Sequence, residues 1–179
     1  MDKALEKEYI DRACRGDTSA FEVLCRENER LVMSVCLSYM KNEHDAEDAC
    51  QETFIKLWRF IPRFKGDSAL STYLYTIAKN TCLDAIKKSS RNIGDELLSN
   101  IADSAPTPEE NYIKKEFREE LYLALTSLDT DAREILLLRE KAGLEYKEIA
   151  QMLSLPEGTV KSRIARAREK LLSKLKEKM

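Results

Sequence analysis

Apolar residues recur every three or four positions along most of the chain, which is the spacing that gives an α-helix one buried face. In the first half this pattern predicts four helices: residues 2–15, a second from Asp17 through Leu37, a third from about His44 to Phe60, and a fourth from Ser68 or Ser71 to about Lys88. Gly16 is expected to cap the first helix and Pro62 to stop the third. Asp17 and one of the two serines are expected to be N-caps.

The helical spacing breaks over residues 89–111, which contain Pro106, Pro108 and several Ser and Asn residues. This composition is typical of a linker, and its length separates two domains more readily than it fits inside one. Helical spacing returns at residues 112–127, 131–141, 145–152 and 156–176, and no strand pattern of convincing length appears. The sequence therefore predicts an all-α chain with two small helical domains, residues 1–90 and 112–179, joined by a flexible linker at residues 91–111.

The charge balance looks unsuited to nucleic acid until it is followed along the chain. The 179 residues include 30 basic and 32 acidic side chains, giving a net charge of −2 and a pI of about 5.7. Positive and negative side chains number 8 and 13 in residues 1–58, 7 and 2 in 59–92, 7 and 14 in 93–156, and 8 and 3 in 157–179. Two basic segments therefore alternate with two acidic ones, which indicates separate interaction surfaces.

The second basic segment begins inside a helix-turn-helix pattern that starts at Tyr146. The apolar positions of its two helices and its turn are Ile149, Ala150, Leu153, Leu155, Val160 and Ile164. Pro156 suits the first turn of the second helix, where a missing N–H costs nothing. The opposite face of that helix carries Lys161, Ser162, Arg163, Arg166, Arg168 and Lys170. A basic helix alone is more often a solvated surface, but together with this turn it predicts binding in the major groove of duplex DNA.

The first basic segment is a predicted helix, residues 71–88, preceded by a short loop. Leu70, Leu74, Ile77 and Ala78 are expected to face a core. Its aromatic, basic and amide side chains, together with those of the loop, are Arg63, Phe64, Lys65, Tyr73, Lys79, Asn80, Lys87 and Lys88. Aromatic side chains beside cations suit unpaired bases, and the loop would shape a pocket for a flipped base. Taken alone, this segment favours the other interpretation, in which Tyr73 and Tyr75 are half-buried core residues.

Acidic and amide side chains crowd the predicted helix that begins near His44. Its apolar stripe is Ala46, Ala49, Thr53, Leu57 and Ile61. Asp48 and Glu52 are four residues apart and therefore share a face, with Gln51 beside them. Repulsion between the two carboxylates would destabilise the helix by about 0.3 kcal/mol. The helix macrodipole explains acids near the N-terminus better than it explains Glu52. A metal ion would need a third ligand, and none stands at a suitable spacing.

The cysteines do not form a disulfide pattern, because the five of them are widely spaced and odd in number. We expect Cys14, Cys25, Cys36, Cys50 and Cys82 to be small buried apolar residues in a reducing cytosol, with redox sensing by an exposed thiol as the alternative. The N-terminus has no apolar secretory segment, and no run of about 18 apolar residues occurs, so a cytoplasmic protein without membrane insertion is predicted. With one histidine, His44, and no glycine-rich phosphate loop, the sequence predicts no catalytic residue, metal or cofactor.

Four ordered motifs carry a family resemblance. They are Gly16-Asp17-x-x-Ala20-Phe21, Asp45-Ala-Glu-Asp48-x-x-Gln51-Glu52-x-Phe54, Ser71-Thr72-x-Leu74-Tyr75-x-Ile77-Ala78-x-Asn80, and Gly158-Thr-Val-Lys-Ser-Arg163-x-x-Arg166-Ala-Arg168. In these motifs and their spacing the chain resembles the extracytoplasmic-function (ECF) group of bacterial RNA polymerase sigma factors over nearly its whole length. Two positions differ from the family pattern: Tyr73 stands where Trp is frequent, and Ala165 where an aromatic residue is common.

The resemblance implies a role for each group of residues. Asp48, Gln51 and Glu52 would bind the clamp helices of the largest subunit of RNA polymerase core, and the flap region of the second largest subunit would be a further partner. The loop around Phe64 and the helix that follows it would capture and melt the −10 element. Thr159, Lys161, Ser162, Arg163, Arg166 and Lys170 would read the −35 element of promoter DNA as duplex. An anti-sigma factor is also implied as an inhibitory partner.

Two other functional classes remain as alternatives. A stand-alone helix-turn-helix regulator would bind operator DNA as a dimer, although the sequence lacks an evident dimerisation heptad and this interpretation leaves residues 71–88 unexplained. An enzyme built on Cys–His chemistry is disfavoured by the single histidine. Because the net charge is slightly negative, we also expect weak binding to free duplex DNA and tighter binding once polymerase covers the acidic helix.

Overall fold

The computed structural model describes residues 2–40, 42–92 and 120–176, and in these ranges the regular structure is entirely helical. The helices of the first half are α1 (Lys3–Cys14), α2 (Thr18–Tyr39), α3 (Glu43–Phe60), the 3-10 turn η1 (Ile61–Arg63) and α4 (Leu70–Asn92). The second half contains a helical stretch at residues 120–126, then α6 (Thr130–Glu140), α7 (Tyr146–Leu153) and α8 (Glu157–Lys176). The predicted all-α class is confirmed. None of the described helices is long and apolar enough to cross a membrane.

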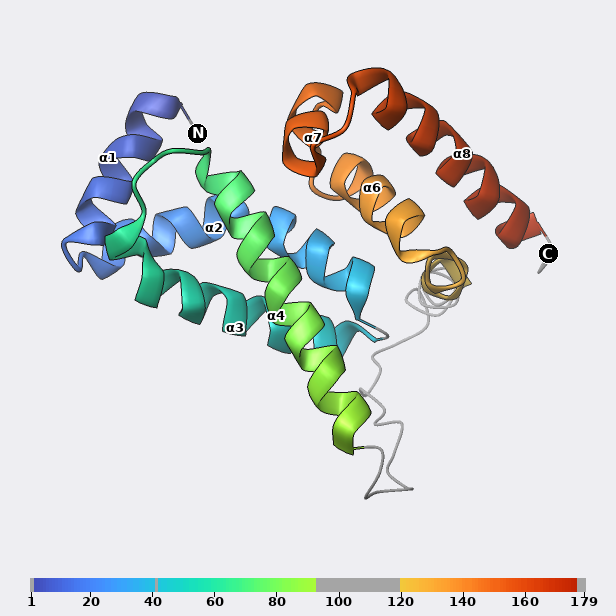
Figure 1. Ribbon diagram of the computed structural model, residues 1–179, viewed down its shortest axis with the longest axis horizontal. Helices are drawn as coiled ribbons and strands as arrows, with labels where there is room; N and C mark the ends of the chain where they lie inside the picture. Colours follow the sequence, from blue (N-terminus) through green and yellow to red (C-terminus); the bar gives the residue numbers. More distant parts are fainter. Residues whose placement is uncertain (1, 41, 93–119, 177–179) are drawn as a thin grey trace, which may run out of the picture.

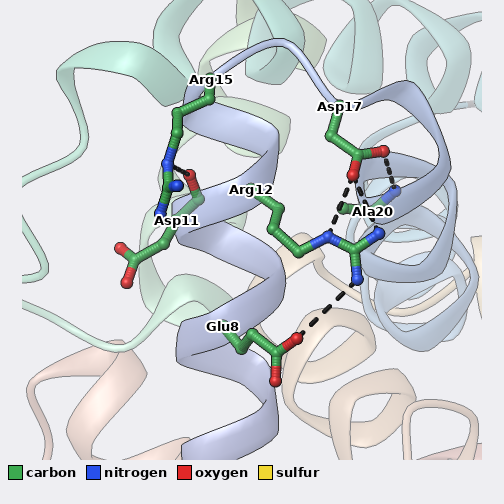
Figure 2. A network of polar contacts seen from close by, with 6 residues as sticks. All are labelled: Glu8, Asp11, Arg12, Arg15, Asp17 and Ala20. Carbon is green, nitrogen blue, oxygen red and sulfur yellow. Dashed lines mark hydrogen bonds and ion pairs between the residues drawn. The ribbon is translucent and has the colours of Figure 1, made fainter.

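The corner between α1 and α2 forms where the sequence predicts it. Gly16 has a φ of +90°, a left-handed conformation that a residue without Cβ adopts readily. Asp17 is the N-cap of α2 and accepts a hydrogen bond of 3.0 Å from the backbone N–H of Ala20. Its other oxygen accepts from Nε of Arg12 at 3.0 Å, and Arg12 also lies 3.8 Å from Glu8 (Figure 2). Glycine and cap together therefore fix the angle at which α1 meets α2.

The start of α4 corrects the predicted serine cap. The helix begins at Leu70, and the carbonyl of Ala69 accepts from the N–H groups of Thr72 and Tyr73, both at 3.1 Å. Ala69, and neither Ser68 nor Ser71, therefore directly precedes the first helical residue, and Ser71 lies inside the first turn. Because the side chain of Leu70 is only 1% exposed, burial of an apolar residue sets this helix start.

Two predicted helix ends differ from the structure by a few residues. α4 continues to Asn92, beyond the expected end near Lys88, so the first residues predicted to be linker are helical. The remaining predicted linker, to residue 111, lies outside the described residues. Pro156 precedes α8, whose first residue is Glu157, and its carbonyl accepts from the N–H of Val160 at 3.1 Å. Pro156 therefore supplies a carbonyl that accepts a hydrogen bond from the first turn of α8. It lies just before the helix, whereas the sequence predicts it within the first turn.

The first half is held by an apolar core among α1 to α4 and η1. The predicted stripe of α3 is buried throughout: Ala46, Ala49, Thr53, Leu57 and Ile61. Leu24 and Val35 of α2 and Leu74 and Ala78 of α4 are also fully buried and face this stripe. Burying each large aliphatic side chain stabilises the fold by about 1.5–3 kcal/mol, so this stripe and its partners fix how the helices pack.

The second half forms its own group of helices, drawn in orange and red in Figure 1. Ile149 of α7 and Val160 and Ile164 of α8 are at most 1% exposed, as the helix-turn-helix pattern predicts. Arg133 of α6 joins the helical stretch 120–126 to this group, since its guanidinium donates to the carbonyls of Leu125, Thr126 and Leu128 at 2.9–3.0 Å.

The two halves pack against each other, which the sequence does not predict. α6 lies against α2, and one cluster of buried residues continues from Val35 and Leu74 in the first half to Ile135 and Leu138 in the second (Figure 1). The sequence predicts two domains with separate small cores. In the structure the two cores meet, and the contact between them includes polar side chains that bear on function.

Candidate functional site

The exposed face of α8 gathers the predicted duplex-reading residues. The side chains of Lys161, Ser162, Arg163, Arg166 and Lys170 are exposed, and Thr159 is half-buried. The turn before α8 contains Ser154 in the left-handed region, at φ +54°, and Leu155, whose N–H donates to the carbonyl of Ala150 at 2.9 Å. This tight turn, together with the buried face of α8, presents the basic face to solvent in one fixed orientation.

The cations of this face differ in their partners. Nζ of Lys161 lies 2.7 Å from Glu157, Nζ of Lys170 donates to Asp129 at 3.0 Å, and Nε of Arg168 donates to Glu140 at 3.0 Å. The pair with Glu157 also raises the pKa of Lys161. In contrast, Arg163 and Arg166 form no ion pair or hydrogen bond with any residue the structure describes. These two arginines are therefore the cations of α8 most available to phosphates or base edges.

The loop before α4 brings together the predicted residues of the flipped-base pocket. The rings of Phe64 and Tyr73 have centroids 5.0 Å apart and planes inclined by 34°. Both side chains are half-buried, and Arg63 and Lys65 on either side of Phe64 are exposed. An aromatic pair with cations beside it provides a surface on which an unpaired base can stack.

Along α4 the remaining predicted residues separate into two groups. Asn80, Lys87 and Lys88 are exposed, as a nucleic-acid surface requires. Lys79 is half-buried: its Nζ lies 5.8 Å and 5.6 Å from the ring centroids of Tyr39 and Tyr75 and donates to the hydroxyl of Tyr75 at 3.3 Å. In this conformation Lys79 faces the second half of the chain.

The two tyrosines of the predicted α4 segment have different environments. Tyr75 is 7% exposed and belongs to the core, so the alternative interpretation holds for this residue. Tyr73 is half-buried and stands against Phe64 at the edge of the core. The sequence could not separate them, because both lie within a few residues of the same apolar stripe.

The acidic face of α3 is exposed beside an apolar residue. Asp48 and Gln51 are exposed and Glu52 is half-buried, and Nε2 of His44 lies 4.0 Å from Asp48. Ile55, one turn beyond Gln51, is 46% exposed. A large apolar side chain at the end of an acidic face suits a protein partner that offers cations around an apolar contact.

The cysteine thiols are largely buried within the first half. Cys36, Cys50 and Cys82 are buried, and Cys14 and Cys25 are half-buried. Burial raises the pKa of Cys25 to about 11 and that of Cys50 to about 11. Both groups are therefore neutral thiols at neutral pH, which is the less reactive form.

One polar cluster was missed at the sequence level. Glu134 of α6 is 5% exposed, and its Oε1 accepts hydrogen bonds from the hydroxyls of Tyr39 and Tyr75, both at 3.0 Å. Burial raises the pKa of Glu134, while nearby Lys79 and the two phenols lower it. The available signal was a glutamate directly before the apolar run Ile135–Leu138, a position that predicts a buried carboxylate but not its partners.

Comparison with known proteins follows the two halves of the chain. The family model for Sigma-70 region 2 matches residues 24–92, and that for Sigma-70 region 4 matches residues 118–171. The ECF RNA polymerase sigma-E factor of Escherichia coli strain K12 is 36% identical over 183 aligned positions, which cover 93% of this chain and 92% of that protein.

Two solved structures share the fold. CnrH, in complex with the cytosolic domain of CnrY, matches with a TM-score of 0.69 over 98% of this chain and 99% of its own, at 24% identity. The sigma factor RpoE, in complex with the anti-sigma factor NepR from Bartonella quintana, matches with a TM-score of 0.60 over 81% of this chain and 89% of its own, at 27% identity. With its region 2, its region 4 and its close relatives, the chain belongs to the ECF group of sigma-70 family RNA polymerase sigma factors and is an alternative sigma factor that directs transcription initiation.

Proposed function

We propose that α8 reads the −35 element of promoter DNA in the major groove, with Arg163 and Arg166 as its main contacts. The observation that carries this proposal is an exposed pair of arginines that have no ion pair or hydrogen bond with the described residues, on a helix whose opposite face is buried. An arginine fork donates two hydrogen bonds to O6 and N7 of guanine or grips a phosphate. Thr159, Lys161, Ser162 and Lys170 complete the face, with Lys161 and Lys170 exchanging their carboxylate partners for phosphates on binding.

The first half of the chain would open the −10 element. The stacked pair Phe64 and Tyr73 supports this role, because base stacking on an aromatic side chain contributes about 1–3 kcal/mol per base. The cations and the amide that would follow the strand are Arg63, Lys65, Lys79, Asn80, Lys87 and Lys88. Domain 1–90 would then hold the melted strand while domain 112–179 holds duplex, with residues 91–111 connecting them.

The acidic face of α3 would bind RNA polymerase core through the clamp helices of the largest subunit. Exposed Asp48 and Gln51, half-buried Glu52 and the neighbouring exposed Ile55 support this assignment. The flap region of the second largest subunit would receive the second half of the chain. An anti-sigma factor is proposed as the inhibitory partner, by analogy with the complex of RpoE and NepR. With these partners the protein would act in the cytoplasm.

Run-off transcription tests the proposed function directly. The full chain, core polymerase and a library of promoter fragments should give products that start at defined positions and depend on this chain. Absence of any promoter-dependent product, together with absence of core binding, would contradict the proposal. A stand-alone regulator would instead give a footprint on duplex DNA without polymerase, so footprinting of the free protein separates the two functions.

A further inference from the structure

Three cations of α8 are bound to carboxylates of the second half, which we call the paired carboxylates. The pairs join Nζ of Lys161 to Glu157 at 2.7 Å, Nε of Arg168 to Glu140 at 3.0 Å, and Nζ of Lys170 to Asp129 at 3.0 Å. Each of the six side chains is between 47% and 59% exposed. The pairs therefore lie at the surface, where an anion from solution can compete for the cations.

The paired carboxylates come from separate places in the second half. Glu157 lies in the first turn of α8, whereas Asp129 is the N-cap of α6 and Glu140 its last residue. Lys161 holds the pKa of Glu157 below its ordinary value of 4.5, and the N–H of Ala132 holds that of Asp129 below 3.8. Both carboxylates are therefore fully charged at neutral pH.

The pair geometry is the one that a DNA phosphate would adopt on the same cations. Charge-assisted N–H···O contacts to carboxylate or phosphate oxygens are about 2.7–2.9 Å long. DNA that binds a paired cation must displace the carboxylate or approach it, and both are unfavourable because two anions repel each other. A displaced carboxylate also takes up a cation from solution, so the exchange releases fewer counterions than binding to an unpaired cation does.

We propose that the paired carboxylates are internal competitors for DNA phosphates, which lower the affinity of α8 for any duplex so that stable binding requires the further contacts of the polymerase complex. This inference rests on the proposed function, because it takes α8 as the surface that meets duplex DNA. It places a cause of weak binding to free DNA within the second half, separate from the net charge of the whole chain.

The test replaces each paired carboxylate by an amide of the same shape: Glu157→Gln, Glu140→Gln and Asp129→Asn. Binding of the free full-length protein to a labelled duplex of mixed sequence is titrated from low to physiological salt. Each variant should bind at least about twofold more tightly, the factor equivalent to the coupling energy of an exposed ion pair, and the triple variant about tenfold or more. The slope of log affinity against log salt should become steeper, by at most about 0.9 for each cation set free.

A matched control separates pairing from net charge. Glu22→Gln removes the same charge and breaks another pair of residues four apart, since Glu22 lies 3.7 Å from Arg26 on α2. Because these residues lie outside the proposed DNA surfaces, affinity and salt slope should remain those of the wild type. If Glu22→Gln tightened binding as much as Glu157→Gln, net charge would determine the affinity and the proposal would be overturned.

A double-mutant cycle separates competition from direct repulsion of DNA. In a Lys161→Ala background the cation that Glu157 binds is absent, so Glu157→Gln can relieve only repulsion between its carboxylate and the phosphates. The gain in affinity should therefore be at least about twofold smaller there than in the wild-type background. An equal gain in both backgrounds would show repulsion alone and would overturn the competition.

Arg166→Ala, measured on the same duplex, separates failure of this inference from failure of the proposed function. Tighter binding in the amide variants together with weaker binding in Arg166→Ala supports both. Tighter binding without an effect of Arg166→Ala supports the competition and contradicts Arg166 as a main contact. Wild-type affinity in all three amide variants, with weaker binding in Arg166→Ala, overturns the competition and leaves the −35 role of α8 in place.

Discussion

At the scale of single residues, Arg166 and Lys161 lie on the same face of α8 and differ in their partners. Arg166 has none among the described residues, whereas Lys161 is paired with Glu157. We expect Arg166→Ala to weaken promoter binding by about 1–3 kcal/mol, because a base-reading or phosphate contact is lost outright. Lys161→Ala should weaken it less, since free Lys161 must first leave its carboxylate. Filter binding of the polymerase holoenzyme to promoter DNA measures both.

The same experiment needs a control on the protein partner. Core polymerase binding should be unchanged in Arg166→Ala, since α8 lies away from α3 (Figure 1). Arg26→Ala, which removes an exposed arginine of α2, should change neither promoter nor core binding. Equal loss of promoter binding in Arg26→Ala would show that net charge, rather than the position of Arg166, determines affinity.

Charge reversal at Glu52 should have the opposite effect to Arg166→Ala: weaker binding to core polymerase and unchanged binding to DNA. Glu52 is half-buried on the proposed polymerase face of α3, so Glu52→Lys places a cation where the partner is expected to offer one. We expect core affinity to fall by about 2–5 kcal/mol if the pair is desolvated, while stacking of a −10 single strand on the free protein stays at the wild-type value. Competition against labelled wild-type protein for core measures the loss.

Glu22→Lys supplies the matched reversal on α2, where the exposed glutamate lies 3.7 Å from Arg26. Its core affinity should remain that of the wild type. If both reversals weakened core binding equally, the acidic face of α3 would not be the polymerase surface.

At the scale of the element, helix starts show which local features the sequence carries. Asp17 caps α2 as predicted, because the cap and its N–H partner are three residues apart. The start of α4 was mispredicted, because the burial of Leu70 depends on helices far away in sequence. The buried face of α8 was predictable from spacing alone. The ion pairs of its cations were not predictable, because their partners are distant in sequence: Lys170 donates to Asp129 and Arg168 to Glu140.

The start of α6 gives a prediction that separates a cap from an ion pair. Asp129 is the N-cap of α6: its Oδ1 accepts from the N–H of Ala132 at 2.8 Å, and its Oδ2 accepts from Lys170 at 3.0 Å. Asp129→Ala should lower the free energy of unfolding by about 1 kcal/mol through loss of the cap. Asp129→Asn keeps a capping oxygen and loses only an exposed ion pair, so its loss should be at most about 0.5 kcal/mol. Urea unfolding at neutral pH measures both values.

The pH dependence of these variants follows from the same contacts. The N–H of Ala132, and secondarily Lys170, hold the pKa of Asp129 below its ordinary value of 3.8. A depressed pKa stabilises the folded state above the ordinary value, and this contribution disappears as the pH falls through the folded-state pKa. The stability difference between wild type and Asp129→Ala should therefore narrow in acid. A constant difference down to about pH 2 would contradict the cap assignment.

At the scale of the whole molecule, the packing of the two halves against each other could not be predicted from the sequence. Glu134 is 95 residues from Tyr39 and 59 from Tyr75, and no periodicity connects positions so far apart. The prediction of two helical domains depended on local spacing, which is why it says nothing of how the halves meet. Burial of Tyr75 and partial burial of Lys79 both follow from that contact, and both depart from a fully exposed nucleic-acid surface.

The contact between the two halves depends on pH, with a sign set by burial of Glu134. While the halves are in contact, burial raises the pKa of Glu134 above its ordinary value of 4.5, whereas the hydrated group of separated halves has that ordinary value. The halves in contact therefore bind more protons, so the stabilisation of the contact by protonation of Glu134 is greatest below about pH 4.5 and is lost as the pH rises through the raised pKa. The groups facing Glu134 are Tyr39, Tyr75, Lys79 and Asp131. Burial raises the pKa of both phenols, which stay neutral in this range.

Scattering across this range tests the sign. In a Tyr39→Phe variant, which removes one hydrogen-bond donor to Glu134 and so weakens the contact between the halves, the radius of gyration should decrease as the pH is lowered from about 8 to about 5. The ratio of molecules with the halves in contact to molecules with the halves apart should change by at most about tenfold per pH unit. Adding Glu134→Gln removes the titrating group, and the dependence should become flat between the same limits. Because Asp131, Lys79 and Tyr75 are still present in that variant, a slope that survives would assign the pH dependence to one of them and not to the carboxylate of Glu134.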